Sequence, residues 1–319
     1  MKNLFIDSNI WLSLYHFSNT DLEQFEKLKE LLNQEVKLFV PQQVIDEVAR
    51  NREAKLKDAL TKFSLPKMQY PAFCKSYVNY NSFKTTYETI KKDYDDWLRT
   101  INEDIANQKL PADKTINLFF NSSSINLIII EDDIIFNAVR RYNLGNPPGK
   151  DKEYGDAVNW ECLLKYVPDY EDLYFVTEDK DYLSSIDSGR MNPFLLKEWQ
   201  AKKQSNIIFH KSLLTFLNTT FDDIRLLQEQ EKEDLIRDLQ KSPNFATTHY
   251  IIAKLTNYTD WNQQQIEELC DAAIENKQVL WILTDEDVKI FYYNLLKNAK
   301  PELIENDSVK EVYDNIMDL

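Results

Sequence analysis

The stretch Leu4-Phe5-Ile6-Asp7-Ser8-Asn9 decides the fold class of this chain. Its apolar residues are of the kind buried in a parallel sheet, and a carboxylate and two small polar residues follow them at once. In open α/β sheets, ligands bind beyond the carboxyl ends of the strands, so Asp7 stands where an acid can take part in chemistry. Capping of the helix that follows is the alternative role for Asp7.

Four further apolar runs predict strands that alternate with helices, and they cover residues 37–41, 126–131, 173–177 and 206–210. This alternation predicts an α/β fold with a central parallel sheet. Residues 61–124 differ in composition and predict a helical insertion, in which apolar and aromatic residues recur every three or four positions from Tyr80 to Ile105. We interpret this stripe as core or partner interface, with stacking on nucleic-acid bases as the alternative.

The length of 319 residues suits two domains, and the charge is distributed unevenly between them. We expect a first domain over residues 1–219, which includes the insertion, and an acidic, all-helical domain over residues 220–319. Of the net charge of −15, −11 belongs to residues 221–319 and −4 to the first 220 residues. Such a chain lacks the broad basic surface of most nucleic-acid-binding proteins, so a phosphate substrate would be held by local Lys or Arg and by metal ions.

Composition also limits the classes of protein to consider. No run approaches the roughly 18 apolar residues that cross a bilayer, and Met1-Lys2-Asn3 leads into a strand, so we expect a cytoplasmic protein without membrane contact. The three cysteines are widely separated, which predicts buried thiols and neither disulfides nor structural zinc. Four glycines are too few for a phosphate-binding loop or a dinucleotide fingerprint.

Several acids lie where the predicted strands and helices would bring them to one edge of the sheet, namely Asp7, Glu47, Asp156, Asp179 and Asp181. A solvated helix face would also explain Glu47, and helix capping would explain Asp156. If they meet, two bare carboxylates about 4 Å apart repel by about 4 kcal/mol at an effective dielectric of 20, so cations or protons must be shared. Oxygen ligands favour Mg²⁺ or Mn²⁺ over zinc. Such a site suits phosphodiester hydrolysis.

The chain resembles the PIN-domain nucleases, and in particular a PIN-like subfamily formerly classed as a domain of unknown function. The residues that carry the resemblance are Phe5-Ile6-Asp7-Ser8-Asn9, Pro41-Gln42-Gln43-Val44-Ile45-Asp46-Glu47, the loop 146–150, Gly155-Asp156-Ala157 and Thr177-Glu178-Asp179-Lys180-Asp181-Tyr182. The resemblance covers about residues 1–215 and implies a PIN-like three-layer sandwich. It implies Asp7, Glu47, Asp156 and Asp179 as catalytic, metal-binding acids and Asp181 as a further ligand. Asn9 and Thr177 would support them.

Membership in this family would imply a metal-dependent endoribonuclease that uses Mg²⁺ or Mn²⁺, in a toxin, RNA-processing or phage-defence role. Single-stranded DNA is the alternative substrate. Substrate phosphates would have local cations to bind, and the candidates are Arg50, Arg140, Arg141, Lys150 and Lys152. The acidic C-terminal domain is interpreted as a module that binds a protein partner or inhibitor, because its charge would repel RNA.

Two rival functions fit parts of the pattern. A PIN-fold protein that has lost activity would serve as an RNA- or protein-binding module, although the complete set of acids favours the enzyme. A haloacid-dehalogenase-type phosphatase also places an aspartate after its first strand. That mechanism requires a second aspartate two residues later, where this chain has Asn9.

Overall fold

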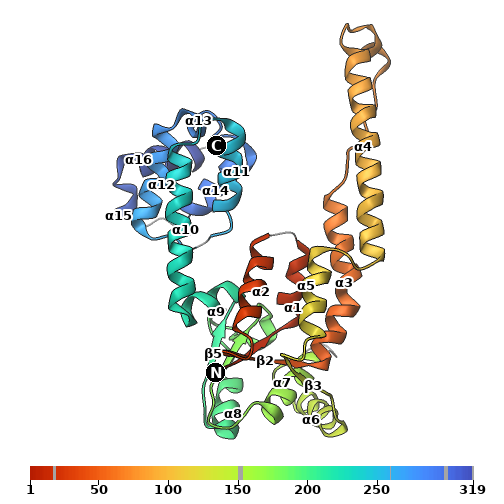
Figure 1. Cartoon of the computed structure of the whole chain (residues 1–319), viewed down its shortest axis with the longest axis vertical. Helices are drawn as coiled ribbons and strands as arrows, with labels where there is room; N and C mark the ends of the chain where they lie inside the picture. The colour runs from red at the N-terminus through yellow and green to blue at the C-terminus, as the bar shows by residue number, and fades with distance from the viewer. Residues whose placement is uncertain (17–18, 150–153, 259, 298–300, 318–319) are drawn as a thin grey trace. The chain divides into compact units, whose positions relative to one another are not determined.

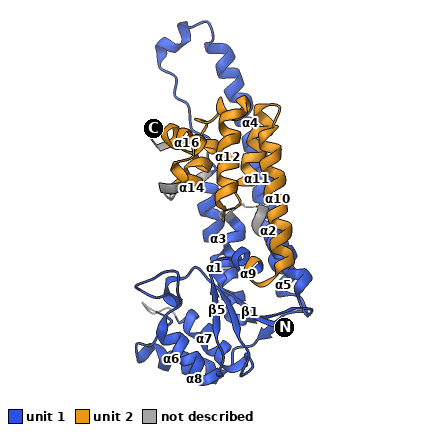
Figure 2. Cartoon of the chain, turned by 90° about the vertical axis from the view of Figure 1, so that its left-hand side faces the viewer, with its two compact units in different colours: residues 1–217 blue, residues 218–319 orange. Residues whose placement is uncertain are grey.

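The structure is a computed structural model of the whole chain, and it describes residues 1–16, 19–149, 154–258, 260–297 and 301–317 (Figure 1). The chain divides into two compact units, residues 1–217 and 218–319, which are coloured separately in Figure 2. Among the described residues, none of the helices combines the length and the apolar content that crossing a bilayer requires.

Unit 1 is built on a parallel sheet with the strand order β3-β2-β1-β4-β5. The strands are β1 (Lys2–Ile6), β2 (Val36–Pro41), β3 (Asn126–Ile128), β4 (Leu173–Val176) and β5 (Ile207–His210). In the register of the sheet, Phe5 of β1 lies between Phe39 of β2 and Phe175 of β4. The opening stretch therefore forms the central strand, and the predicted α/β fold with a parallel sheet is confirmed.

Helices cover both faces of this sheet. The helices of unit 1 are α1 (Ser8–Ser13), η1 (Leu14–His16), α2 (Asn19–Leu31), α3 (Gln42–Lys62), η2 (Ala72–Ser76), α4 (Tyr80–Ala106), α5 (Pro111–Phe120), α6 (Asp132–Asn143), α7 (Gly155–Tyr166), η3 (Lys180–Tyr182) and α8 (Pro193–Lys203), and α9 (Leu213–Thr220) begins in unit 1 and ends in unit 2. Figures 1 and 2 show α1, α2, α3 and α5 on one side of the sheet and α6, α7 and α8 on the other. The result is a three-layer sandwich.

Large aromatic side chains hold the layers together. On one face, the Trp11 ring packs against Phe25 and Phe119, with ring centroids 4.6 and 5.4 Å apart. On the other face, Trp160 packs against Trp199, with centroids 5.8 Å apart. All five side chains are buried, and burial of each such ring removes about 150–250 Å² of surface from water. This packing fixes the strand ends from which the site is built.

The predicted long helix of the insertion is confirmed as α4, but its aromatic stripe is not part of the core. Residues 63–106, which we call the arm, form a hairpin in which an extended segment, η2 and α4 run side by side (Figure 1). No residue of α4 is buried. The stripe is therefore not core, and the other half of the interpretation, a partner interface, stays a prediction. Within the described chain, the segment before α4 covers part of the stripe.

Unit 2 is all-helical. Its helices are α10 (Asp222–Gln240), α11 (Phe245–Leu255), α12 (Gln263–Glu275), α13 (Lys277–Leu280), α14 (Glu286–Leu296), α15 (Pro301–Ile304) and α16 (Asp307–Met317). They enclose an apolar cluster of their own, in which Ile252, Leu269 and Val309 are buried. Because this cluster draws only on residues after 235, unit 2 has a separate hydrophobic core.

Candidate metal centre

Two neighbouring strands deliver polar side chains to the same edge of the sheet. Asp7 directly follows β1, and Thr177 directly follows β4. The Asp7 N–H donates to the carbonyl of Val176 at 3.0 Å, so the two segments stay adjacent beyond the last pair of strand residues. Parallel pairing therefore places Asp7 and Thr177 side by side at the carboxyl end of the sheet.

The Asp7 carboxylate is buried and held in one orientation. Its side chain is 2% exposed. The Ser8 N–H donates to Oδ1 at 2.8 Å, and the Thr177 hydroxyl donates to Oδ2 at 2.6 Å. Asp7 is also the N-cap of α1, so the capping alternative describes part of its role. Two donors are fewer than a buried carboxylate can accept, which leaves acceptor capacity for a further ligand.

Thr177 links three of the predicted site residues. Its hydroxyl donates to Asp7, and its oxygen accepts from the Asp179 N–H at 2.8 Å and from the Asn9 side-chain amide at 3.2 Å. A hydroxyl has one donor and two acceptor positions, so these contacts use all of them. Thr177 therefore fixes both the Asp7 carboxylate and the start of the turn that carries Asp179.

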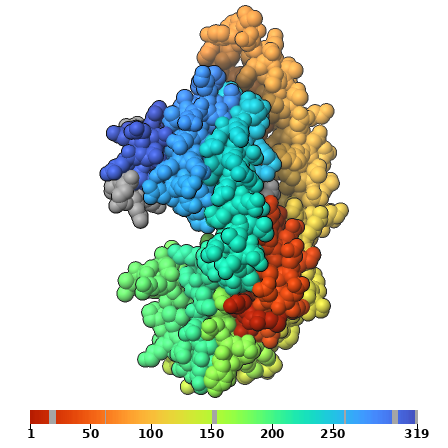
Figure 3. Space-filling view, turned by 60° about the vertical axis from the view of Figure 1, so that its left-hand side comes forward, coloured from red at the N-terminus to blue at the C-terminus, as the bar shows by residue number. Residues whose placement is uncertain are grey.

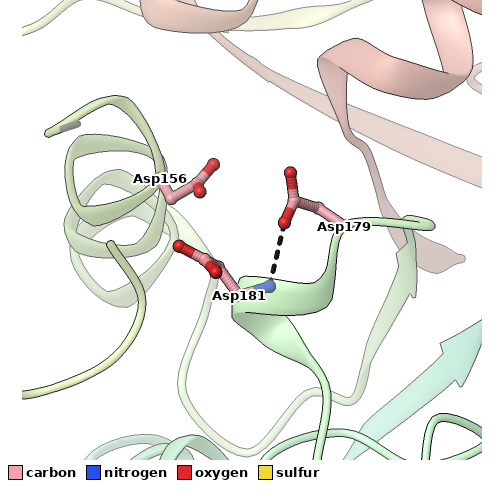
Figure 4. A group of neighbouring side chains, drawn as sticks. All are labelled: Asp156, Asp179 and Asp181. Atoms are coloured by element: carbon pink, nitrogen blue, oxygen red, sulfur yellow. Dashed lines mark hydrogen bonds between the residues drawn. The ribbon is translucent and has the colours of Figure 1, made fainter. Parts of the chain in front are cut away.

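Three aspartates meet in front of this edge (Figure 4). Asp156 lies in the first turn of α7, and Asp179 and Asp181 lie in the segment that follows β4. One carboxylate oxygen from each lies within 4.8 Å of the others. The Asp181 N–H donates to Asp179 Oδ1 at 2.8 Å, which gives the short helix η3 an N-cap and sets the Asp179 carboxylate beside Asp181.

The pKa values show that Asp7 and Glu47 belong to the same electrostatic cluster. Burial raises the pKa of Asp7 from 3.8 to about 7, against the hydrogen bonds from Thr177 and Ser8, and the charges of Glu47 and Asp179 raise it further. Burial likewise raises the pKa of Asp156 to about 8, and Asp7, Asp179, Glu47 and Asp181 add to the rise. Without a metal ion, the Asp7 and Asp156 carboxyls therefore retain protons for part of the time at neutral pH.

Gly155 explains how Glu47 reaches this cluster. Glu47 lies in the second turn of α3, and Gly155 is the first residue of α7. A Cβ atom at position 155 would lie 2.7 Å from the Gln43 amide nitrogen and 3.6 Å from Glu47 Oε2. Glycine at position 155 leaves room for the Gln43 amide and brings the start of α7 close to Glu47, whereas a larger residue would displace the Gln43 side chain.

The cluster fits a hard divalent cation. The charged atoms that could bind a metal there are all carboxylate oxygens, the ligands that Mg²⁺ and Mn²⁺ prefer. The side-chain oxygen of Asn9 is buried beside them and accepts no hydrogen bond within the described parts of the chain. A bound cation would accept the Asn9 oxygen as a ligand and would lower the pKa values of Asp7 and Asp156. The unsatisfied oxygen and the two raised pKa values therefore fit a cation site.

Two polar residues near the site, Tyr182 and Asn159, were not predicted from the sequence. The buried Tyr182 hydroxyl donates to the Asp156 carboxylate at 3.3 Å and so helps to orient it. Asn159 lies one turn after Asp156 and is completely buried, and neither of its amide atoms has a hydrogen-bond partner in the described chain. In the sequence, Asn159 could have been noticed as an amide that lies three positions after an acid, between the apolar residues Val158 and Trp160.

The five predicted substrate-binding cations fall into three groups. Arg50 and Arg140 are exposed, whereas Lys150 and Lys152 lie outside the described residues. Arg141 is only 5% exposed. Its guanidinium donates to Glu161 at 2.7 Å and to Glu198 at 2.6 Å, so Arg141 stabilises the fold and is not available to a phosphate.

We expect Arg141→Met to lower the free energy of unfolding by about 3–5 kcal/mol, because it leaves the Glu161 and Glu198 carboxylates without their cation. Urea unfolding at neutral pH measures this loss. The exposed neighbour Arg140 provides the matched control, and Arg140→Met should change stability by no more than about 0.5 kcal/mol. Equal effects of the two substitutions would contradict a structural role for Arg141.

Comparison with known proteins agrees with the geometry. A family model described as PIN domain matches residues 4–182, a span that contains β1, Glu47, Asp156 and the segment that follows β4. Neither the curated proteins nor the solved structures contain a significant match to the chain.

Proposed function

The chain belongs to the PIN-domain family, and on that premise we propose that it is a metal-dependent endoribonuclease. The observation that carries the proposal is the cluster of carboxylates at the carboxyl edge of the sheet, where Asp156, Asp179 and Asp181 approach within 4.8 Å. Asp7 and Glu47 contribute to the same electrostatic field. Buried acids with raised pKa values cluster at functional sites, where a bound cation can balance their charge.

Asp156, Asp179 and Asp181 would hold Mg²⁺ or Mn²⁺, with Asp7 and Glu47 completing the charge of the site. When bound, such a cation activates water and stabilises negative charge on the phosphoryl group. Thr177 and Ser8 keep the Asp7 carboxylate pointed at the cluster, and Tyr182 does the same for Asp156. These donors are rigid because they come from the ends of packed strands and helices.

A cavity beside the cluster offers room for substrate. It has a volume of about 630 Å³, and its lining includes Asp181, Lys180, Ser184 and Ser188. Lys180 is exposed and lies between two of the acids in sequence, so it is a further candidate for contact with a phosphate. The serine hydroxyls can donate to phosphate and sugar oxygens, contacts that position a nucleic acid without reading its sequence.

The inactive binding module stays the rival function, and the acid set argues against it. A protein that only binds RNA has no use for carboxylates that raise one another's pKa values and repel the phosphate backbone. The toxin or phage-defence role stays a prediction. So does the role of unit 2 as an acidic module that binds a protein partner.

Incubation of the full-length protein with mixed RNA and single-stranded DNA tests the proposal. We expect RNA to be shortened in Mn²⁺ or Mg²⁺ and to stay intact in EDTA, because the acids need the cation to bring a phosphate close. Gel electrophoresis of end-labelled substrates measures the products. Cleavage at the same rate in EDTA, or none with any metal, would contradict a metal-dependent nuclease, and equal cleavage of DNA would contradict the preference for RNA.

A further inference from the structure

The arm, residues 63–106, uses part of its aromatic stripe to hold itself together. Phe63 packs against Tyr94 and Trp97, with ring centroids 5.3 and 5.1 Å apart. The Tyr87 hydroxyl donates to the Pro66 carbonyl at 2.6 Å. These contacts fasten the extended segment to α4 and explain why the hairpin forms without burial of any α4 residue.

Other apolar side chains of the arm are left in solvent. Phe73 and Tyr77, within and directly after η2, are each 68% exposed. The outer end of the arm is the orange surface in Figure 3. Exposed aromatic side chains that lie close together in the chain are a candidate interaction site, because they gain little from the fold.

The charge of this part of the arm is opposite to that of the chain. Residues 63–92 contain one glutamate and five lysines, at positions 67, 75, 84, 91 and 92, in a chain with a net charge of −15. All five lysines are exposed. The glutamate, Glu88, lies 3.6 Å from Lys84 and neutralises one of them. Residues 63–92, which we call the outer arm, therefore keep an excess of four positive charges, whereas residues 93–106 carry an excess of four negative charges.

We propose that residues 63–92 bind single-stranded RNA. Proteins that bind single strands combine cations that follow the backbone with exposed aromatic rings on which bases stack, and the outer arm has both. An acidic protein partner would account for the lysines but not for the exposed rings beside them. The inference deepens the proposed function, on which it rests, because it assigns substrate capture to a surface separate from the acids.

Chain connectivity supports delivery from the arm to the acids. Helix α3 carries Glu47 in its second turn and ends at Lys62, where the arm begins. At 1.5 Å per residue, these two positions are about 23 Å apart along a single helix. Tyr77 lies just before the start of α4, and the other end of that 27-residue helix contacts Arg52 of α3, so Tyr77 is about 40 Å further out. A strand captured there is tethered several nanometres from the carboxylates, which themselves repel RNA.

Fluorescence anisotropy of a labelled, unstructured RNA tests the proposal, with the full-length protein in EDTA so that cleavage does not interfere. We expect Phe73→Ser/Tyr77→Ser to raise Kd by about tenfold or more, because stacking of bases is lost. We expect Lys67→Gln/Lys75→Gln/Lys84→Gln to reduce the slope of log K against log salt by about 2, at about 0.7 for each lysine.

Matched controls carry the same changes outside the arm. They are Tyr170→Ser/Tyr250→Ser and Lys29→Gln/Lys197→Gln/Lys241→Gln, all at exposed positions. Circular dichroism verifies that the arm variants keep their helix content. The proposal is overturned if the arm variants bind RNA as tightly as these controls, or if double-stranded RNA competes equally, because paired bases cannot stack on Phe73 and Tyr77.

The same measurements separate the two proposals. Normal RNA binding by the arm variants, together with metal-dependent cleavage by the wild type, would remove the arm's role and leave the nuclease intact. Arm-dependent RNA binding without cleavage in any metal would remove the nuclease and leave the arm as an RNA-binding surface.

Discussion

Asp156→Asn lowers the rate of metal-dependent RNA cleavage by at least about a hundredfold, since the cation's contribution to transition-state stabilisation is several kcal/mol and each tenfold is about 1.4 kcal/mol. Asp156 faces both Asp179 and Asp181, and its carboxylate is the one that connects α7 to the segment after β4. Asparagine keeps the shape of the side chain and removes one negative charge from the cluster. Single-turnover cleavage of a labelled RNA measures the effect.

The matched control is Asp132→Asn. Asp132, like Asp156, lies in the first turn of a helix, but it is exposed on α6 and is not in the cluster. The Asp132→Asn variant should cleave RNA at the wild-type rate. If Asp132→Asn and Asp156→Asn reduce cleavage equally, or if neither does, the carboxylate cluster is not the catalytic centre.

In the absence of metal, the protein becomes less stable as the pH rises from about 4 to about 8. Asp7 has a pKa of about 7 in the folded chain and an ordinary value of 3.8, so in this range the folded state holds a proton that the unfolded state has released. Stability is therefore lost as the pH passes through the folded pKa. For Asp7 alone the shift corresponds to about 4 kcal/mol, at about 1.4 kcal/mol per unit.

His210 acts in the opposite direction over part of this range. Burial lowers its pKa from 6.5 to about 4, so it adds stability as the pH rises from about 4 to 6.5. Above pH 6.5 His210 no longer contributes, and Asp156, with a pKa of about 8, accounts for about 2 kcal/mol of loss between about pH 6.5 and 9.

Urea unfolding in EDTA across this range measures the decline. Addition of Mn²⁺ should restore stability more at pH 8 than at pH 5, because the cation replaces the protons that the acids share. Asp156→Asn should flatten the curve above pH 6.5 and weaken the response to Mn²⁺. A wild-type curve that is flat above pH 6.5 would show that burial and the neighbouring acids do not raise the pKa of Asp156 in the folded state.

The sequence predicts which face of α6 is buried, although the predicted role of Arg141 in binding substrate was wrong. Ile134, Ala138 and Arg141 follow one another at intervals of four and three and are all buried, whereas Arg140 lies on the exposed face. Helical periodicity therefore places Arg141 inside, where a charge requires partners. The partners themselves, Glu161 and Glu198, come from other helices and no local pattern identifies them.

The aromatic stripe of α4 shows the limit of periodicity. A period of three and four residues predicts a helix with one apolar face, and α4 has that form. What covers the face depends on the segments that fold against it. Among the described residues a short extended segment covers part of it, and the remaining rings are exposed.

The sequence by itself determined the strands, their order of alternation with helices and the places where acids follow strand ends. These features are encoded by residue type and by periods of two and 3.6 along the chain, which need no partner to be recognised. Only the tertiary structure decided that Asp156, Asp179 and Asp181 meet, that Asp7 and Asp156 retain protons at neutral pH, and that Arg141 is internal. Distance and desolvation depend on what lies opposite a side chain, and in this fold the opposing residues come from other segments, from 20 positions away for Arg141 and Glu161 to 170 for Asp7 and Thr177.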